Sequence, residues 1–146
     1  MPKAITPDLF INRELSLLQF NRRVLELAAD GSVPLLERLR FLCISSSNLD
    51  EFFEVRVARL QQQLKHDISP NDPAGMSAEE QLDAIAREAH KLVRDQYAQF
   101  NDTLIPLLKK QGIHFLRRSE WTEAQSQWLS NHFKRELAPL LTPLGL

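Results

Sequence analysis

The sequence is poor in glycine and cysteine, with four glycines and one cysteine among 146 residues. No Gly-x-x-x-x-Gly-Lys loop, Gly-x-Gly-x-x-Gly turn or Gly-x-Ser-x-Gly elbow occurs, which argues against the common phosphate-binding loops and against this type of serine nucleophile. The single cysteine, Cys43, cannot form an intramolecular disulfide, and its apolar neighbours predict a small buried side chain.

Long apolar runs and an excess of charge are also absent. No apolar run approaches the roughly 20 residues of a membrane-spanning helix, and the N-terminus lacks the basic-then-apolar order of a secretory signal. The 18 basic residues nearly cancel the 19 acidic residues, without the broad positive field that nucleic-acid binding uses. We therefore expect a cytoplasmic protein with no transmembrane segment and no nucleic-acid partner.

The histidines are scattered, with no second ligand at metal-binding spacing: His66, His90, His114 and His132. We predict that the chain contains no catalytic residue and no metal ligand.

Capping-box pairs predict the starts of three helices, namely Ser16 with Gln19, Ser77 with Glu80, and Thr122 with Gln125. The first helix is expected from about Ser16 to Ala29. The capping box at Ser77 begins a helix that is predicted to run from Ala78 to about Lys110. Pro106 should kink or shorten this helix, and Gly112 should end it. Because it is unusually long, this helix is expected either to run antiparallel to its neighbours or to project as an arm.

Between these helices, Pro34 opens another helix that is predicted to end at the serine cluster 45–47, where the chain would turn. Ser47 or Asn48 would then cap a further helix reaching about Leu64. Residues 66–75 read as a loop, and residues 113–116 as a short strand that needs a partner. The apolar tail 140–146 is what a cut inside a longer polypeptide would leave.

The segment 45–56 combines a polar turn, an amide side chain and a predicted helix start. Helix starts bind anions and polar ligands, whereas the simpler interpretation is that Asn48 only caps backbone N-H groups. Two roles are open for Arg56 and Arg59, pairing with carboxylates or contact with a phosphate, and a solvated or ion-paired helix face is favoured.

Three motifs in order resemble the opening of the bacterial polyphosphate kinase 1 family: ELSLLQFNRRVL at 14–25, PLLERLRFL at 34–42 and SNLDEFF at 47–53. The resemblance is dense over about residues 10 to 60 and collinear through Trp128 to Pro143. Leu17 stands where the family often has Trp, and Ser47 where it often has Asn.

The resemblance implies a large multidomain enzyme, a phosphoprotein that moves the terminal phosphate of ATP reversibly onto polyphosphate through a phosphohistidine and with Mg²⁺. Residues 1–111 would be its N-terminal helical domain and 112–146 the beginning of the next domain, so the fold is expected to be all-α, a helical bundle with one long helical arm, truncated at the start of an α/β domain. The catalytic histidine and the Mg²⁺ ligands would lie in later domains, and Asn48 would contact ATP. The implied partners are ATP, ADP, polyphosphate, the remaining domains and further copies in a homo-oligomer.

Two alternative functions fit parts of the helical pattern. One is a helical docking or oligomerisation module without nucleotide contact, which would use an exposed stripe of the 78–110 helix or of the last helix. The other is a helix-turn-helix DNA reader, which is disfavoured because Asp50, Glu51 and Glu54 would repel DNA phosphates at the start of the recognition helix.

Overall fold

The chain is all-α and divides into two compact units, Met1–Gln111 and Gly112–Leu146. The structure is a computed structural model that describes residues 6–68 and 72–142, and over these residues it contains helices and no strand. The all-α prediction is confirmed. Each unit is described separately below.

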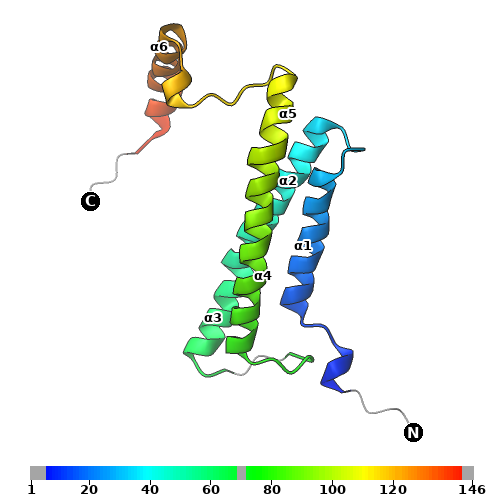
Figure 1. The fold of residues 1–146 in the computed structure, drawn as a ribbon. Coiled ribbons are helices and arrows are strands. Elements are labelled where there is room, and N and C mark those ends of the chain that lie inside the picture. Colours follow the sequence, from blue (N-terminus) through cyan, green and yellow to red (C-terminus); the bar gives the residue numbers. More distant parts are fainter. Residues whose placement is uncertain (1–5, 69–71, 143–146) are drawn as a thin grey trace. The chain divides into compact units, whose positions relative to one another are not determined.

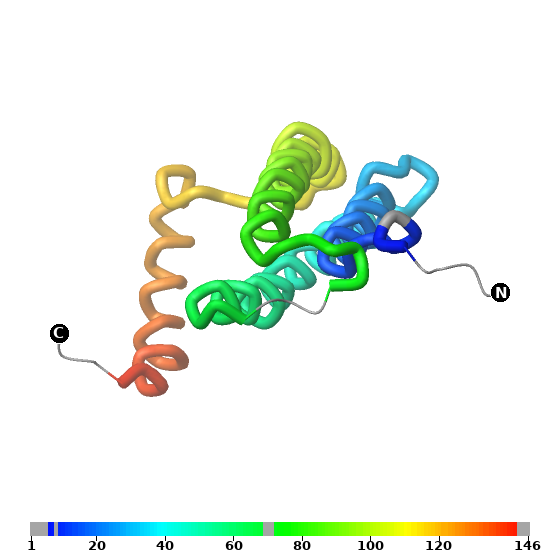
Figure 2. Tube along the Cα trace, turned by 90° about the horizontal axis from the view of Figure 1, so that it is seen from below, coloured from blue at the N-terminus to red at the C-terminus, as the bar shows by residue number. Residues whose placement is uncertain are grey.

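In its described residues, the first unit consists of three helical stretches that run side by side (Figures 1 and 2). A short 3-10 turn, Pro7–Leu9, precedes α1, Arg13–Ala29. The second stretch joins α2, Leu35–Glu51, a π-helical segment η2, Phe52–Val57, and α3, Ala58–Lys65. The third joins α4, Ala78–Ala98, a π-helical segment η3, Gln99–Leu104, and α5, Ile105–Lys110.

The long third stretch lies along the bundle. It is antiparallel to α2 and α3 and contacts α1, α2 and α3 (Figure 1). Its buried residues, spaced at helical intervals, join the side chains of the other two stretches in one apolar core, made up of Leu18, Leu25, Ala28, Leu42, Leu49, Phe52, Val57, Leu60, Ile85, Leu92 and Leu104. Pro106 is the second residue of α5, directly after η3, and the helix ends before Gly112, which adopts a left-handed φ of 80°.

The predicted start of the first helix was wrong. Asn12, not Ser16, is the N-cap, because its Oδ1 accepts hydrogen bonds from the backbone N-H groups of Glu14 and Leu15, each at 3.0 Å. Asn12 is buried, and its Nδ2 donates to Asp72 Oδ2 at 3.0 Å. Asp72 Oδ2 also accepts from the backbone N-H of Met76, so the cap ties α1 to the segment that precedes α4. The other two capping boxes, at Ser77 and Thr122, are confirmed.

The predicted turn at the serine cluster was also wrong. Helical backbone continues from Leu35 to Lys65, so residues 45–47 lie within α2 and Asn48 does not begin a helix. Serine has only moderate helix propensity, and tertiary packing overrides such preferences. Ser45 is fully buried, which indicates that a small side chain is needed where α2 packs.

The end of α1 is tied to both other stretches. The carbonyl oxygen of Ala28 lies in the last turn of α1, where carbonyl groups lack partners within their own helix. It accepts from Arg38 Nε of α2 and from Gln99 Nε2 of η3, each at 2.8 Å. Two side chains therefore satisfy one orphan carbonyl, and Arg38 is buried in doing so.

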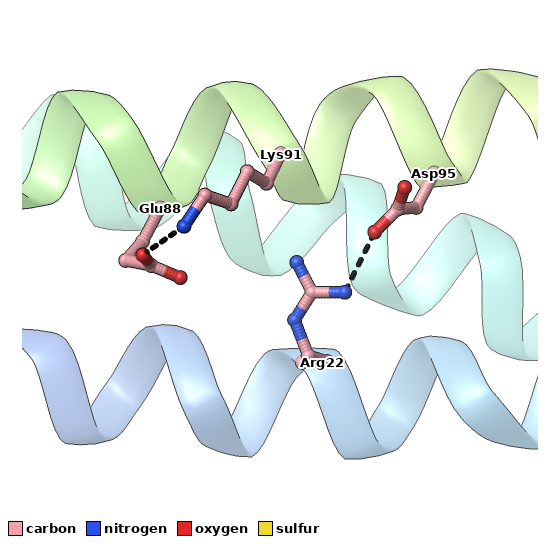
Figure 3. Close-up of polar contacts among 4 residues, drawn as sticks. All are labelled: Arg22, Glu88, Lys91 and Asp95. Atoms are coloured by element: carbon pink, nitrogen blue, oxygen red, sulfur yellow. Dashed lines mark hydrogen bonds and ion pairs between the residues drawn. The ribbon is translucent and has the colours of Figure 1, made fainter.

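Exposed ion pairs lie on the α1 and α4 side of the bundle (Figure 3). Arg22 Nη1 of α1 lies 2.7 Å from Asp95 Oδ2 of α4, and within α4 Lys91 Nζ donates to Glu88 Oε1 at 2.7 Å. Such exposed pairs each contribute up to about 1 kcal/mol. The apolar core and the buried hydrogen bonds therefore stabilise the bundle more than these pairs do.

The second unit contains a 3-10 turn, Arg118–Glu120, then α6, Glu123–His132, a π-helical segment η5, Phe133–Leu137, and a 3-10 turn, Ala138–Leu140. The strand predicted at 113–116 was wrong, because these residues are irregular and exposed. None of these four elements contains a buried residue. The end of the predicted apolar tail, 143–146, lies outside the described residues.

Cys43, predicted to be buried, is exposed on α2. Leu42 is buried whereas Cys43 and Ile44 are exposed, because successive residues of a helix point in different directions and an apolar run in the sequence need not lie on the buried face. Among the described residues, no helix combines the length and the apolar character that crossing a membrane requires.

The position of the first cap can be tested by comparing two alanine variants. Asn12→Ala removes the cap and the Asp72 contact, so the free energy of unfolding should fall by about 1 to 2 kcal/mol. Ser16→Ala should change it by less than about 0.5 kcal/mol, because Ser16 is exposed and caps nothing. Urea unfolding followed by circular dichroism measures both, and a larger loss for Ser16→Ala would contradict the assignment.

Glu88 offers a test of the electrostatics. The hydrogen bond from Lys91 lowers the pKa of the Glu88 carboxyl, outweighing the opposing effect of partial desolvation. Lys91→Met should raise the pKa of Glu88 toward its ordinary value, as followed by NMR titration of its carboxyl carbon. A carboxyl whose pKa is lower in the folded than in the unfolded state stabilises the fold at pH values above its unfolded-state pKa. Lys91→Met should therefore be less stable than the unmodified chain near neutral pH, and this difference should vanish as acid protonates Glu88. Lys110→Met, outside this pair, is the control; a Glu88 pKa unmoved by Lys91→Met would reject the pairing.

Candidate functional site

An open groove of about 260 Å³ lies between α1 and the region where α2 continues into η2. Its volume is below the roughly 300 to 1,000 Å³ of ordinary ligand pockets, so it can cover only part of a nucleotide-sized ligand. Its walls are mainly apolar, with a few polar groups among them: Leu17, Leu18, Phe20, Asn21, Asn48, Leu49, Glu51, Phe52, Val55 and Arg56.

The polar floor of the groove is a chain of hydrogen bonds between α1 and α2. Asn21 Nδ2 donates to the backbone carbonyl oxygen of Ser45 at 2.9 Å, and Asn48 Nδ2 donates to Asn21 Oδ1 at 3.1 Å. Asn21 is only 4% exposed, so both ends of its carboxamide are used inside the bundle. Buried polar groups are tolerated when they are hydrogen-bonded in this way.

This chain fixes the orientation of the Asn48 amide. A carbonyl oxygen can only accept, so Ser45 requires the NH₂ end of Asn21, and the Asn21 oxygen then requires the NH₂ end of Asn48. The Asn48 Oδ1 accepts no hydrogen bond within the described part of the chain. Asn48 therefore offers an acceptor, and its remaining N-H, to a ligand in the groove.

The large apolar side chains at the rim of the groove are exposed to solvent. Phe20 is 51% exposed, and the guanidinium carbon of Arg23 lies 5.9 Å from the centre of its ring. Leu17 and Val55 are exposed as well. The rim therefore presents an aromatic ring and apolar side chains at the edge of the groove.

Two of the residues considered from sequence lie in the groove and a third does not. Asn48 and Arg56 both line it, whereas Arg59 is exposed, is absent from the lining and forms no ion pair with any residue the structure describes. Arg56 Nη1 lies 3.8 Å from Glu14 Oε1 of α1. The ion-paired interpretation of Arg56 is confirmed, although the pair is a loose one.

Sequence reasoning missed Asn21, although a signal was present. Leu18, Leu25 and Ala28 mark the buried face of α1, and Asn21 falls on the same face at helical spacing. A polar residue on an otherwise apolar face indicates either a buried hydrogen bond or a binding group. The partner on α2 could not be found, because residues 45–47 were assigned to a turn.

The histidines do not gather into a site. Over residues 6–68 and 72–142 the structure contains no group of three or more His, Cys, Asp or Glu side chains arranged to hold a metal ion. His132 stacks on Trp128 with ring centres 5.1 Å apart, in the second unit.

The sequence model of the polyphosphate kinase N-terminal domain matches residues 10–116, which include every residue of the groove. The chain belongs to the polyphosphate kinase family. It is 52% identical over 136 residues to a polyphosphate kinase of Paraburkholderia phytofirmans, covering 93% of this chain and 20% of the relative. It is 54% identical over 134 residues to a polyphosphate kinase of Neisseria meningitidis serogroup B, covering 92% of this chain and 20% of the relative.

A solved structure is also similar. The crystal structure of polyphosphate kinase from Porphyromonas gingivalis matches with a TM-score of 0.73 at 35% sequence identity, covering 92% of this chain and 19% of that chain. The chain therefore spans about a fifth of the length of these polyphosphate kinases.

The hydrogen-bond chain predicts opposite effects for two alanine variants. Asn21→Ala removes one buried and one part-buried hydrogen bond and should lower the free energy of unfolding by about 1 to 3 kcal/mol. Ser45→Ala should be neutral or stabilising, because the buried Ser45 Oγ has no partner among the described residues while the backbone carbonyl stays in place. Urea unfolding measures both; a Ser45→Ala loss as large as that of Asn21→Ala would refute this account.

Proposed function

We propose that this chain is the nucleotide-covering N-terminal part of an enzyme that reversibly transfers the terminal phosphate of ATP to polyphosphate. The match to the N-terminal domain of the family and the names of the relatives support the reaction. The orientation of Asn48 in the groove supports the nucleotide contact. The chain itself supplies a lid and no catalytic group.

In this proposal Asn48 binds ATP through its carboxamide. A nucleobase has an apolar face and an edge of hydrogen-bond donors and acceptors, which suits a groove with an aromatic rim and one oriented amide. Because the groove is small and open, it would contact one side of the nucleotide, and the rest of the pocket would come from other domains. An isolated lid of this kind should bind ATP weakly.

The proposed reaction also involves Mg²⁺ and a phosphorylated histidine, which the resemblance to the family assigns to later domains. We place both in domains beyond this chain, whose own part in the proposal is to contact the nucleotide. Mg²⁺ would there supply positive charge beside the phosphate groups.

Residues 112–146 would be the beginning of the next domain. The described elements of this unit expose large apolar side chains, among them Trp128, Phe133 and Leu137, and bury none. A helix with an apolar face is stable when another element covers that face. The relatives are about five times as long as this chain and so contain further domains that could cover it. The rest of the same polypeptide is the cover we propose.

A helical docking or oligomerisation module is the second candidate. An apolar depression of about 430 Å³ lies between α2 and α4 and includes the exposed Phe53 and Tyr97. The molecular mass of such a module in solution would depend on protein concentration, and added nucleotide would not change it. A homo-oligomer and a cytoplasmic location remain predictions beside either function.

The test compares polyphosphate synthesis by the full-length enzyme with its Asn48→Ala variant over a range of ATP concentrations. Loss of one hydrogen bond should lower kcat/KM for ATP by up to about tenfold, mainly through a higher KM. Ser47→Ala is the matched control, because Ser47 is adjacent, exposed and outside the groove lining.

Two other results would count against the proposal. If Asn48→Ala is kinetically silent but less stable, Asn48 only links α1 to α2. If the unmodified full-length protein makes no polyphosphate, the proposed reaction itself is wrong.

A further inference from the structure

Arg56 shares the groove with Asn48 although it lies eight positions further along the chain. In a regular α-helix each residue turns by roughly 100°, so eight residues end about 80° away from the starting direction. Here η2, Phe52–Val57, lies between them, and its wider i→i+5 winding reduces this offset. The π-helical segment therefore helps to bring both side chains to one surface.

The guanidinium of Arg56 has unused hydrogen-bonding capacity. It carries five N-H donors, and its partner within the described regions is one carboxylate oxygen, Glu14 Oε1, at 3.8 Å. That distance exceeds the 2.7 to 2.9 Å or so of a charge-assisted hydrogen bond. Its side chain is 31% exposed, so the free donors can reach a ligand.

Glu14 lies deeper than Arg56, with a side chain that is 14% exposed. Its second oxygen, Oε2, is buried and has no hydrogen-bond partner in the described part of the chain. Glu14 stands in the first turn of α1, where the helix dipole favours a negative charge. A carboxylate held there attracts the guanidinium at 3.8 Å without satisfying its donors.

We propose that Arg56 binds a phosphate group in this groove and that Glu14 positions its guanidinium for that contact. This inference rests on the proposed function and adds to it a second binding group with a different ligand chemistry. The planar fork of a guanidinium matches two oxygens of one phosphate. An α-helical rise of about 1.5 Å per residue puts Asn48 and Arg56 at most about 12 Å apart along the helix, and the wider winding of η2 shortens this separation. Such a spacing suits an elongated ligand with a polar head and an anionic tail.

The local charges show how Arg56 must act. Its positive charge is opposed by Glu14 and by Glu51, which also lines the groove, so long-range attraction of an anion is weak. Binding then depends on direct hydrogen bonds from the guanidinium to phosphate oxygens. Lysine keeps the charge and loses the fork, so Arg56→Lys should rescue Arg56→Gln only in part.

Phosphate groups are present in both ATP and polyphosphate, and the experiment separates them. In the full-length enzyme, KM for ATP is measured in synthesis and KM for polyphosphate in the reverse reaction with ADP. Inhibition by adenosine, which has no phosphate, is measured beside them. The variants are Arg56→Gln and Arg56→Lys, with Arg59→Gln as the matched control outside the groove lining.

We expect Arg56→Gln to raise KM for ATP roughly tenfold or more, because a hydrogen bond to a charged group is lost, and to leave adenosine inhibition unchanged. A rise confined to KM for polyphosphate would assign the phosphate to the polymer. Unchanged KM for both substrates would overturn the inference. Asn48→Ala should instead weaken the binding of ATP and of adenosine alike. If Asn48→Ala has no such effect, the proposed function fails, whereas the phosphate contact is judged from Arg56→Gln.

The positioning role of Glu14 is tested by a double-mutant cycle on KM. Glu14→Gln alone should raise KM for ATP with little change in kcat, and it should add little in an Arg56→Gln background. Equal effects in both backgrounds would show that Glu14 acts independently of Arg56. Thermal unfolding of each variant identifies any loss that comes from the fold alone.

Discussion

Asn21 places a polar side chain inside the contact between α1 and α2, and both the bundle and the groove depend on how its amide is satisfied. The amide nitrogen holds the backbone of α2 at Ser45, and the amide oxygen turns Asn48 toward the groove. Because every group in such a chain can be paired in only one way, the orientation at the surface is set from inside the core. The stability of the α1–α2 contact and the orientation of the Asn48 amide therefore share the same two hydrogen bonds.

Features that depend on neighbours in sequence could be predicted. The capping boxes at Ser77 and Thr122 each require only a hydroxyl and a side chain three residues later, and both are formed. The long third stretch also followed from the spacing of apolar residues along one helix. These patterns are local, so no knowledge of other segments was needed.

Features that depend on distant segments could not be predicted. Ser45 is helical because α2 packs there, Asn12 is a cap that also holds Asp72, and residues 113–116 have no strand to pair with among the described residues. The residues of the candidate site also separate into those that a local pattern identifies and those that depend on distant segments. Asn48 could be singled out from its motif, whereas its link to Asn21 and the Arg56 pair with Glu14 cross from α2 and η2 to α1.

The Ala28 carbonyl has a mechanical consequence for the bundle. Side chains from the second and third stretches converge on this one oxygen at the end of the first, so a slide of either stretch by one helical turn would break a hydrogen bond there. The oxygen acts as a common reference point for the register of the bundle. A bundle that packs its stretches out of register would accordingly leave this carbonyl short of a donor, so the oxygen helps to select the native alignment of the three stretches.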